Sequence, residues 1–164
     1  MKNAGLLIAI ALAGVFLATI LFSGEDLQPR LAPDFSLQSL DDERITLSDY
    51  RGQVVVMDFW ATWCSPCLKS FPHLHDVVSR YQGEGVVLLV VSLDKSAQRA
   101  RDYLIENGYA TSNVLWESLD AARGVKEQFG VVGIPRTFII DREGFIQYAG
   151  HPGQLTYEEL GKWL

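Results

Sequence analysis

The stretch VVVMDFWATWCSPC, residues 54–67, decides the fold that we expect for this chain. Residues 53–60 form a nearly continuous apolar run rich in β-branched side chains, which is typical of a strand buried on both faces. Residues 64–82 then place apolar side chains at helical spacing. We therefore expect a buried strand that leads directly into a helix, with Cys64 and Cys67 in the first turn of that helix.

Cys64 and Cys67 are the only cysteines among the 164 residues. A structural disulfide normally stabilises a protein by closing a long loop, and a bond between these two residues would close almost none. Two cysteines at this spacing, where a strand gives way to a helix, indicate a redox pair. Metal binding is the alternative, because thiolates bind soft metals.

The first residues predict a membrane anchor. Residues 4–22 carry no charge, and nineteen helical residues span about 28 Å, close to the thickness of a bilayer's hydrocarbon core. Lys2 precedes this segment and Glu25 and Asp26 follow it, which favours a cytoplasmic N-terminus and a domain on the extracytoplasmic side. We expect an uncleaved anchor over 4–22, a tether over 23–33 and one domain over 34–164.

A cleavable signal peptide is the competing interpretation of the same segment. The small-x-small site at Ala11-Leu12-Ala13 comes too early, because cleavage there would leave an apolar stub. Cleavage after Ser23 or Gly24 would place a residue that is too large at the −3 position. The anchor is therefore the favoured interpretation.

Composition and patterning indicate one α/β domain that does not bind nucleic acid. About 140 residues follow the anchor, enough for one core, and the net charge of −6 lacks the clustered basic residues that nucleic acid requires. Strands alternate with helices before a final hairpin, so we expect parallel crossovers followed by an antiparallel edge. The expected strands cover 32–37, 45–47, 53–60, 86–91, 114–116, 137–140 and 145–148, and the expected helices cover 64–82, 96–107, 121–129 and 156–164.

Several of these segments resemble known proteins. Residues 56–67 resemble the active-site segment of thioredoxins. Residues 32–35 (APDF), Phe71-Pro72 and residues 133–141 (GIPRTFIID) resemble the membrane-anchored branch, the TlpA/ResA/CcmG-like (redoxin) family of extracytoplasmic thiol-disulfide oxidoreductases. The resemblance covers about residues 30–164 and fits the predicted anchor.

The resemblance implies a thioredoxin fold, with a mixed central β-sheet flanked by helices, that reduces disulfides in partner proteins outside the cytoplasm. Many members serve cytochrome c maturation, so apocytochrome c is one implied substrate, and a membrane thiol transporter is the implied electron donor. No cofactor or metal is expected. The branch often carries an acidic residue six positions after the first cysteine, where this chain has Ser70.

We assign Cys64 as the nucleophile and Cys67 as the resolving cysteine. Disulfide exchange needs a thiolate, and a cysteine at a helix N-terminus meets unpaired N–H groups and the positive end of the helix dipole. Pro66 fits the first turn, where its missing N–H costs nothing. Because Ser65-Pro66 brings no charged or histidine partner for the thiolate, we expect a reducing pair.

Asp58, at the end of the buried strand, is expected to pass a proton to or from Cys67, since burial raises the pKa of a carboxyl. The alternative is an aspartate that only hydrogen-bonds to backbone. The thioredoxin fold would set Pro135 opposite the cysteines, after a cis peptide bond. We expect Ile134 to pair with an extended substrate segment and Trp63 to form part of the docking surface.

Two other functions remain as alternatives. A copper-carrying metallochaperone would use Cys64 and Cys67 as ligands. The anchored copper chaperones, however, have a wider cysteine spacing and a histidine, and the only methionines here are Met1 and Met57. A peroxidase is disfavoured because the Pro and Thr that position a peroxidatic cysteine are missing just before Cys64.

Overall fold

The computed structural model describes residues 30–164. The predicted anchor over 4–22 and residues 23–29 of the predicted tether lie outside the described residues. Between Arg30 and Leu164, no helix has the length and apolar character needed to span a membrane.

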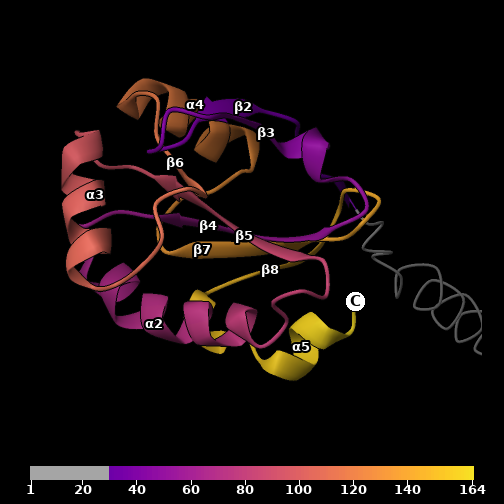
Figure 1. Ribbon diagram of the computed structural model, residues 1–164. Coiled ribbons are helices and arrows are strands. Elements are labelled where there is room, and N and C mark those ends of the chain that lie inside the picture. Colours follow the sequence, from indigo (N-terminus) through magenta and orange to yellow (C-terminus); the bar gives the residue numbers. More distant parts are fainter. Residues whose placement is uncertain (1–29) are drawn as a thin grey trace, which may run out of the picture.

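A six-stranded sheet forms the centre of the domain (Figure 1). In sheet order, its strands are β1 (Arg30–Leu31), β8 (Phe145–Gly150), β7 (Arg136–Ile140), β4 (Val54–Trp60), β5 (Val86–Ser92) and β6 (Val114–Leu115). β4 pairs in parallel with β5 and β5 with β6, whereas β7, β8 and β1 are joined by antiparallel pairing. All seven residues of β4 are buried, which confirms the doubly covered strand that the apolar run predicts.

Helices cover both faces of this sheet, and the right-handedness of parallel crossovers decides the face on which two of them lie. The crossovers from β4 to β5 and from β5 to β6 step in the same direction, so α2 (Ser65–Ser79) and α3 (Ala97–Glu106) lie on the same face. The short α5 (Tyr157–Gly161) joins them there (Figure 1). α4 (Leu119–Gln128) covers the other face, together with the hairpin of β2 (Ser36–Gln38) and β3 (Arg44–Thr46).

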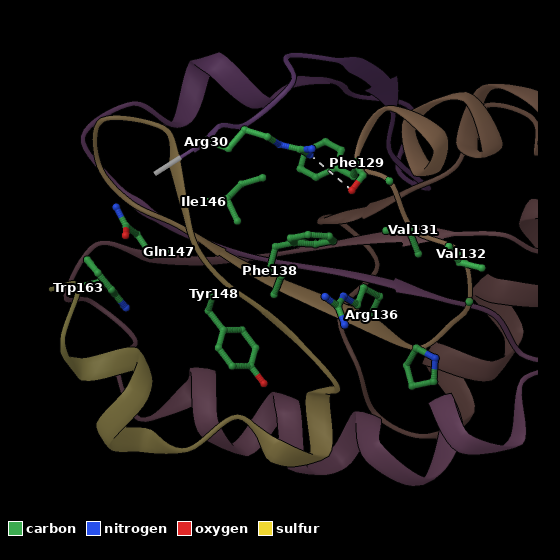
Figure 2. Close-up of a pocket in the computed structure, with 14 residues that line it drawn as sticks. Arg30, Phe129, Val131, Val132, Arg136, Phe138, Ile146, Gln147, Tyr148 and Trp163 are labelled. Atoms are coloured by element: carbon green, nitrogen blue, oxygen red, sulfur yellow. Dashed lines mark hydrogen bonds between the residues drawn. The ribbon is translucent and has the colours of Figure 1, made fainter. Parts of the chain in front are cut away.

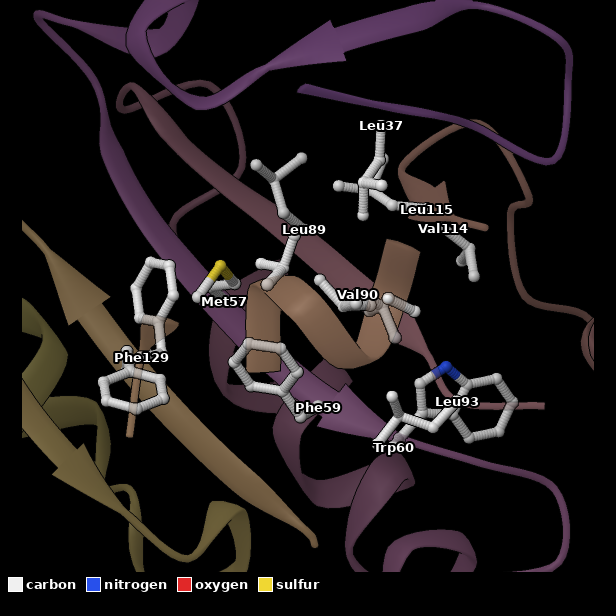
Figure 3. Packing of buried hydrophobic residues seen from close by; sticks show 14 of the residues in the cluster. Leu37, Met57, Phe59, Trp60, Leu89, Val90, Leu93, Val114, Leu115 and Phe129 are labelled. Atoms are coloured by element: carbon white, nitrogen blue, oxygen red, sulfur yellow. The ribbon is translucent and has the colours of Figure 1, made fainter. Parts of the chain in front are cut away.

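The core follows from the two-residue alternation of β4. Val54 and Val56 pack into a cluster with Leu74 of α2 and Leu160 of α5. Met57 and Phe59 belong to the other cluster, seen in Figure 3, where the Phe59 ring lies 5.9 Å from that of Phe129. The sheet is therefore fixed from both faces, and the end of β4 is held rigidly where it leads to Cys64.

Most expected elements are confirmed, with differences at their ends. The helix predicted over 64–82 ends at Ser79, and the one predicted over 156–164 is reduced to Tyr157–Gly161. In place of the strand predicted over 32–37, the chain forms β2 over Ser36–Gln38, which pairs with β3. The hairpin of β7 and β8 supplies the antiparallel side of the sheet, as expected, but β8 is not the outermost strand, because β1 pairs with it.

The sheet also begins earlier in the chain than expected. Arg30 and Leu31, which we placed in the tether, form β1 and pair with Ile146 and Phe145 of β8. The Ala32 N–H extends this pairing by donating to the Gly144 carbonyl at 2.9 Å. The outer edge of β8 offers unpaired backbone groups, and this segment satisfies them.

Candidate active site

The two cysteines lie at the junction between β4 and α2. They form a disulfide, with their Cα atoms 5.2 Å apart. Cys64 is the N-cap of α2, and its Sγ accepts a hydrogen bond from the Cys67 backbone N–H at 3.2 Å. Pro66 lies in the first turn, as expected from its missing N–H. The helix end thus directs an N–H group at the Cys64 sulfur.

The surroundings of the two sulfurs differ. Cys64 is 5% exposed and Cys67 only 1%, while the neighbouring Ser65 and Pro66 are exposed. Trp63 is 60% exposed, and its indole N–H donates to the Leu93 carbonyl at 3.4 Å. Trp63, Ser65 and Pro66 are thus the exposed part of the motif, and Cys64 is slightly more accessible than Cys67.

Asp58 lies on β4 and is 2% exposed. Its side chain points to the same face as Val54 and Val56, the face that α2 covers. The Thr137 hydroxyl on the paired strand β7 donates to Asp58 Oδ1 at 2.6 Å. Burial raises the pKa of Asp58 to about 8, and the hydrogen bond from Thr137 acts in the opposite direction. The carboxyl group therefore exchanges its proton near neutral pH, as general acid–base chemistry requires.

The loop before β7 faces the cysteines. The peptide bond between Ile134 and Pro135 is cis, which confirms that expectation. Phe59 pairs with Arg136, so this loop lies at the end of β4 that leads to Cys64. Ile134 is half-buried against the cluster that contains both cysteines. Within residues 30–164 its backbone makes no hydrogen bond, so its N–H and C=O remain available to an added strand.

Lys126 of α4 holds this loop, a role that the sequence did not reveal. Its ammonium group donates to the carbonyl oxygens of Val131 at 2.5 Å and Val132 at 3.1 Å. The lysine follows no recognisable motif. Its only signal is a position in the last turn of a helix, where a cation commonly binds free carbonyl groups.

A second buried carboxyl group, Asp94, braces the turn before Cys64. Asp94 is fully buried and accepts hydrogen bonds from the Thr62 N–H at 3.1 Å and the Thr62 hydroxyl at 2.6 Å. The Ser92 hydroxyl donates to it at 3.0 Å. Asp94 follows β5, and β4 and β5 are parallel, so the ends of both strands lie at the same edge of the sheet. The sequence signals this position of Asp94 only through the parallel arrangement of β4 and β5.

Trp60 and Ser70, on either side of the cysteines, are both buried. Trp60 is fully buried and stacks on Phe71 with ring centroids 5.1 Å apart, so it is a core residue. Ser70 is buried and donates to the carbonyl oxygens of Pro66 and Cys67. The position where related proteins often carry an acidic residue is thus a hydroxyl turned back onto its own helix.

A hollow of about 870 Å³ lies on the β8 side of the cis-proline loop. Figure 2 shows that Arg136, Phe138 and Tyr148 line it, and the Arg136 guanidinium lies 5.9 Å from the Phe138 ring centroid. No group of three or more potential metal-ligating side chains occurs among the described residues.

Comparisons with known proteins agree with this geometry. The chain is similar to the thioredoxin-like protein YneN of Bacillus subtilis, with 33% identity over 81% of this chain and 76% of the relative. It is also similar to the thiol-disulfide oxidoreductase ResA of Geobacillus kaustophilus, with 30% identity over 100% of this chain and 92% of the relative.

Among solved structures, the thioredoxin domain of a thiol-disulfide oxidoreductase from Bacteroides vulgatus matches with a TM-score of 0.70. It is 25% identical, and the match covers 82% of this chain and 92% of that one. The domain thus has the thioredoxin fold, and the protein is a dithiol–disulfide oxidoreductase that acts on disulfide-containing proteins. Residues 30–149 match the AhpC/TSA family, to which this chain therefore belongs.

Proposed function

We propose that this protein is a membrane-tethered, extracytoplasmic reductant of protein disulfides, with Cys64 as the attacking sulfur. The observation that carries the proposal is the position of Cys64 as the N-cap of α2, where the Cys67 N–H donates to its Sγ. N–H groups at a helix end stabilise a thiolate, the form of cysteine that attacks disulfides.

The reaction takes two exchange steps. The Cys64 thiolate attacks one sulfur of the substrate disulfide, and the other substrate sulfur leaves and takes up a proton. Cys67 then loses its proton and attacks the Cys64 sulfur, which releases the second substrate thiol and leaves the Cys64–Cys67 disulfide. We assign Asp58 as the group that accepts the Cys67 proton, since its carboxyl lies on the α2 face and titrates near neutrality.

The predicted anchor supports an extracytoplasmic location. Residues 4–22 are uncharged and long enough to span a bilayer, with Lys2 on one side and acidic residues on the other. The similarity to ResA extends over 100% of the chain and so includes this segment. Alkaline phosphatase, fused after Leu164, tests the location. An enzymatically active fusion that stays with carbonate-washed membranes agrees with the proposal, and an inactive fusion contradicts it.

Substrate capture tests the assigned chemistry. In Cys67→Ala the first exchange step proceeds but the second does not, so partner proteins remain bound to Cys64 as mixed disulfides. Mass spectrometry of the captured species names the substrates, with apocytochrome c as the expected class, and identifies the membrane thiol donor. Cys64→Ala is the matched control and should capture none. Equal capture by the two variants would contradict the roles that we assign.

A further inference from the structure

A second hollow, of about 460 Å³, lies on the α4 side of the cis-proline loop. Trp63 and Ile134, the residues that precede Cys64 and Pro135, both line it. A polypeptide bound at Ile134 and joined to Cys64 therefore passes beside this hollow. Its apolar wall consists of Trp63, Leu93, Leu119, Val132 and Ile134.

The rest of the lining is cationic, from Lys95, Arg123 and Lys126. The Lys126 ammonium group already donates hydrogen bonds to the carbonyl groups of the loop. Lys95 and Arg123 are exposed. Arg123 lies 3.8 Å from Asp120, but Asp120 is 96% exposed, and such surface pairs are weak. Two cationic side chains thus remain accessible to a bound segment.

The hollow on the other side of the cis-proline loop also has a cationic lining. The larger hollow is lined by Arg30 and Arg136, and Val132 and Gly133 line both hollows. Among the described residues that line the two hollows, five are cationic and none is acidic. The chain as a whole carries a net charge of −6, so this cationic region is opposite in sign to the protein that bears it.

We propose that the hollow beside Trp63 selects disulfide substrates in which an apolar side chain and carboxylates flank the reacting cysteine. The apolar side chain fills the hollow, and the carboxylates lie against Lys95 and Arg123. The inference rests on the proposed function, since it assumes attack by Cys64. Charges at the rim of a binding surface act mainly on the rate of association and on the choice of partner.

Matched peptide disulfides test this selection. Each synthetic peptide carries one cysteine, joined to 2-mercaptoethanol, next to a leucine, and is flanked by two glutamates or by two lysines. The reduced full-length protein in a neutral detergent converts the peptide disulfide to peptide thiol and free 2-mercaptoethanol and becomes oxidised itself. Chromatography of acid-quenched samples gives the rate constant for each peptide. We expect the glutamate peptide to react about fivefold faster, as two weak ion pairs would allow.

Charge reversal identifies the side chains that cause the preference for the glutamate peptide. Lys95→Glu/Arg123→Glu should invert the preference, so that the lysine peptide reacts faster. Arg51→Glu is the control, because Arg51 is exposed, lines neither hollow and lies before β4, at the opposite end of that strand from Cys64. It should keep the wild-type preference. Replacing leucine with serine in the glutamate peptide should slow the wild-type reaction about threefold or more, through loss of apolar burial.

The outcomes separate this inference from the proposed function. Bis(2-hydroxyethyl) disulfide is small and neutral, so the wild type and the two charge-reversal proteins of this experiment should reduce it at equal rates. If the wild type reduces this compound but shows no preference between the two charged peptides, the selection is refuted and the reductase function stands. A preference that the double reversal leaves unchanged, or that Arg51→Glu also inverts, refutes it as well. Failure to reduce any of these disulfides overturns both.

Discussion

At the scale of single residues, Asp58 carries an electrostatic cost, because burial removes its carboxyl group from water. It is 2% exposed, and the Thr137 hydroxyl compensates part of the loss of water. A natural sequence retains such a group when its proton has a use, because a neutral residue of similar shape would be more stable. The buried carboxyl therefore supports chemistry more than folding.

This cost predicts how stability depends on pH. Asp58 holds its proton up to about pH 8 in the folded protein, whereas its ordinary pKa is 3.8. Between those values the unfolded chain binds fewer protons, so the free energy of unfolding falls as pH rises, by about 1.4 kcal/mol per pH unit. Urea unfolding of the oxidised protein between about pH 5 and pH 7 measures this slope.

Two variants isolate the contribution of Asp58. Asp58→Asn removes the titrating group, so its stability should lack this slope and exceed that of the wild type near neutral pH. Thr137→Val removes the hydrogen bond that lowers the Asp58 pKa, so the decline in stability should extend to higher pH. Equal pH dependence in the wild type and Asp58→Asn would contradict the raised pKa.

At the scale of elements, the site is a junction at one edge of the sheet, where β4 and β5 end and the loop before β7 leads into that strand. The bond from Thr62 to Asp94 joins two loops that are 32 residues apart in sequence, and it fixes the turn between Trp60 and Cys64. A hydroxyl donor to a fully buried carboxyl should contribute more than a similar bond at the surface, since water cannot replace it.

Thr62→Val tests this bracing. The substitution keeps the shape of the side chain and removes the donor, so we expect unfolding to become easier by about 1.5–3 kcal/mol and reduction of bis(2-hydroxyethyl) disulfide to slow. Thr111→Val is the control, because the Thr111 hydroxyl donates to Asp41 at 2.8 Å at the surface. It should cost less than about 1 kcal/mol and leave the rate unchanged. Equal losses in both variants would contradict a bracing role for Thr62.

The sequence predicted those parts of the junction that have a local signal. An apolar run marked β4, helical spacing marked α2, and the residues around Pro135 resembled a known loop. β1 was not predicted, because a strand of two residues exists only through its pairing with β8. The hydrogen bonds from Thr62 to Asp94 and from Lys126 to the Val131 carbonyl were also not predicted, since they join separate elements and leave no periodic pattern.

At the scale of the whole molecule, the protein exists in a dithiol and a disulfide form, and its direction of reaction depends on which form the fold favours. The end of α2 favours the dithiol form by stabilising the Cys64 thiolate. The first turn of α2, residues 65–68, brings no basic or histidine side chain that would stabilise the thiolate further and make the pair more oxidising. Lys95 and Arg123 are exposed, so salt screens their effect on the sulfur.

We therefore expect a reducing pair, with a potential nearer thioredoxin's roughly −270 mV than DsbA's roughly −120 mV. Equilibration of the full-length protein with dithiothreitol buffers, read by alkylation of the free thiols, measures it. A value above about −180 mV would contradict the expectation. Lys95→Glu/Arg123→Glu should shift the potential by less than about 30 mV, which corresponds to about 1.4 kcal/mol. A larger shift would mean that these cations act on the thiolate itself, which would contradict the screening that we expect.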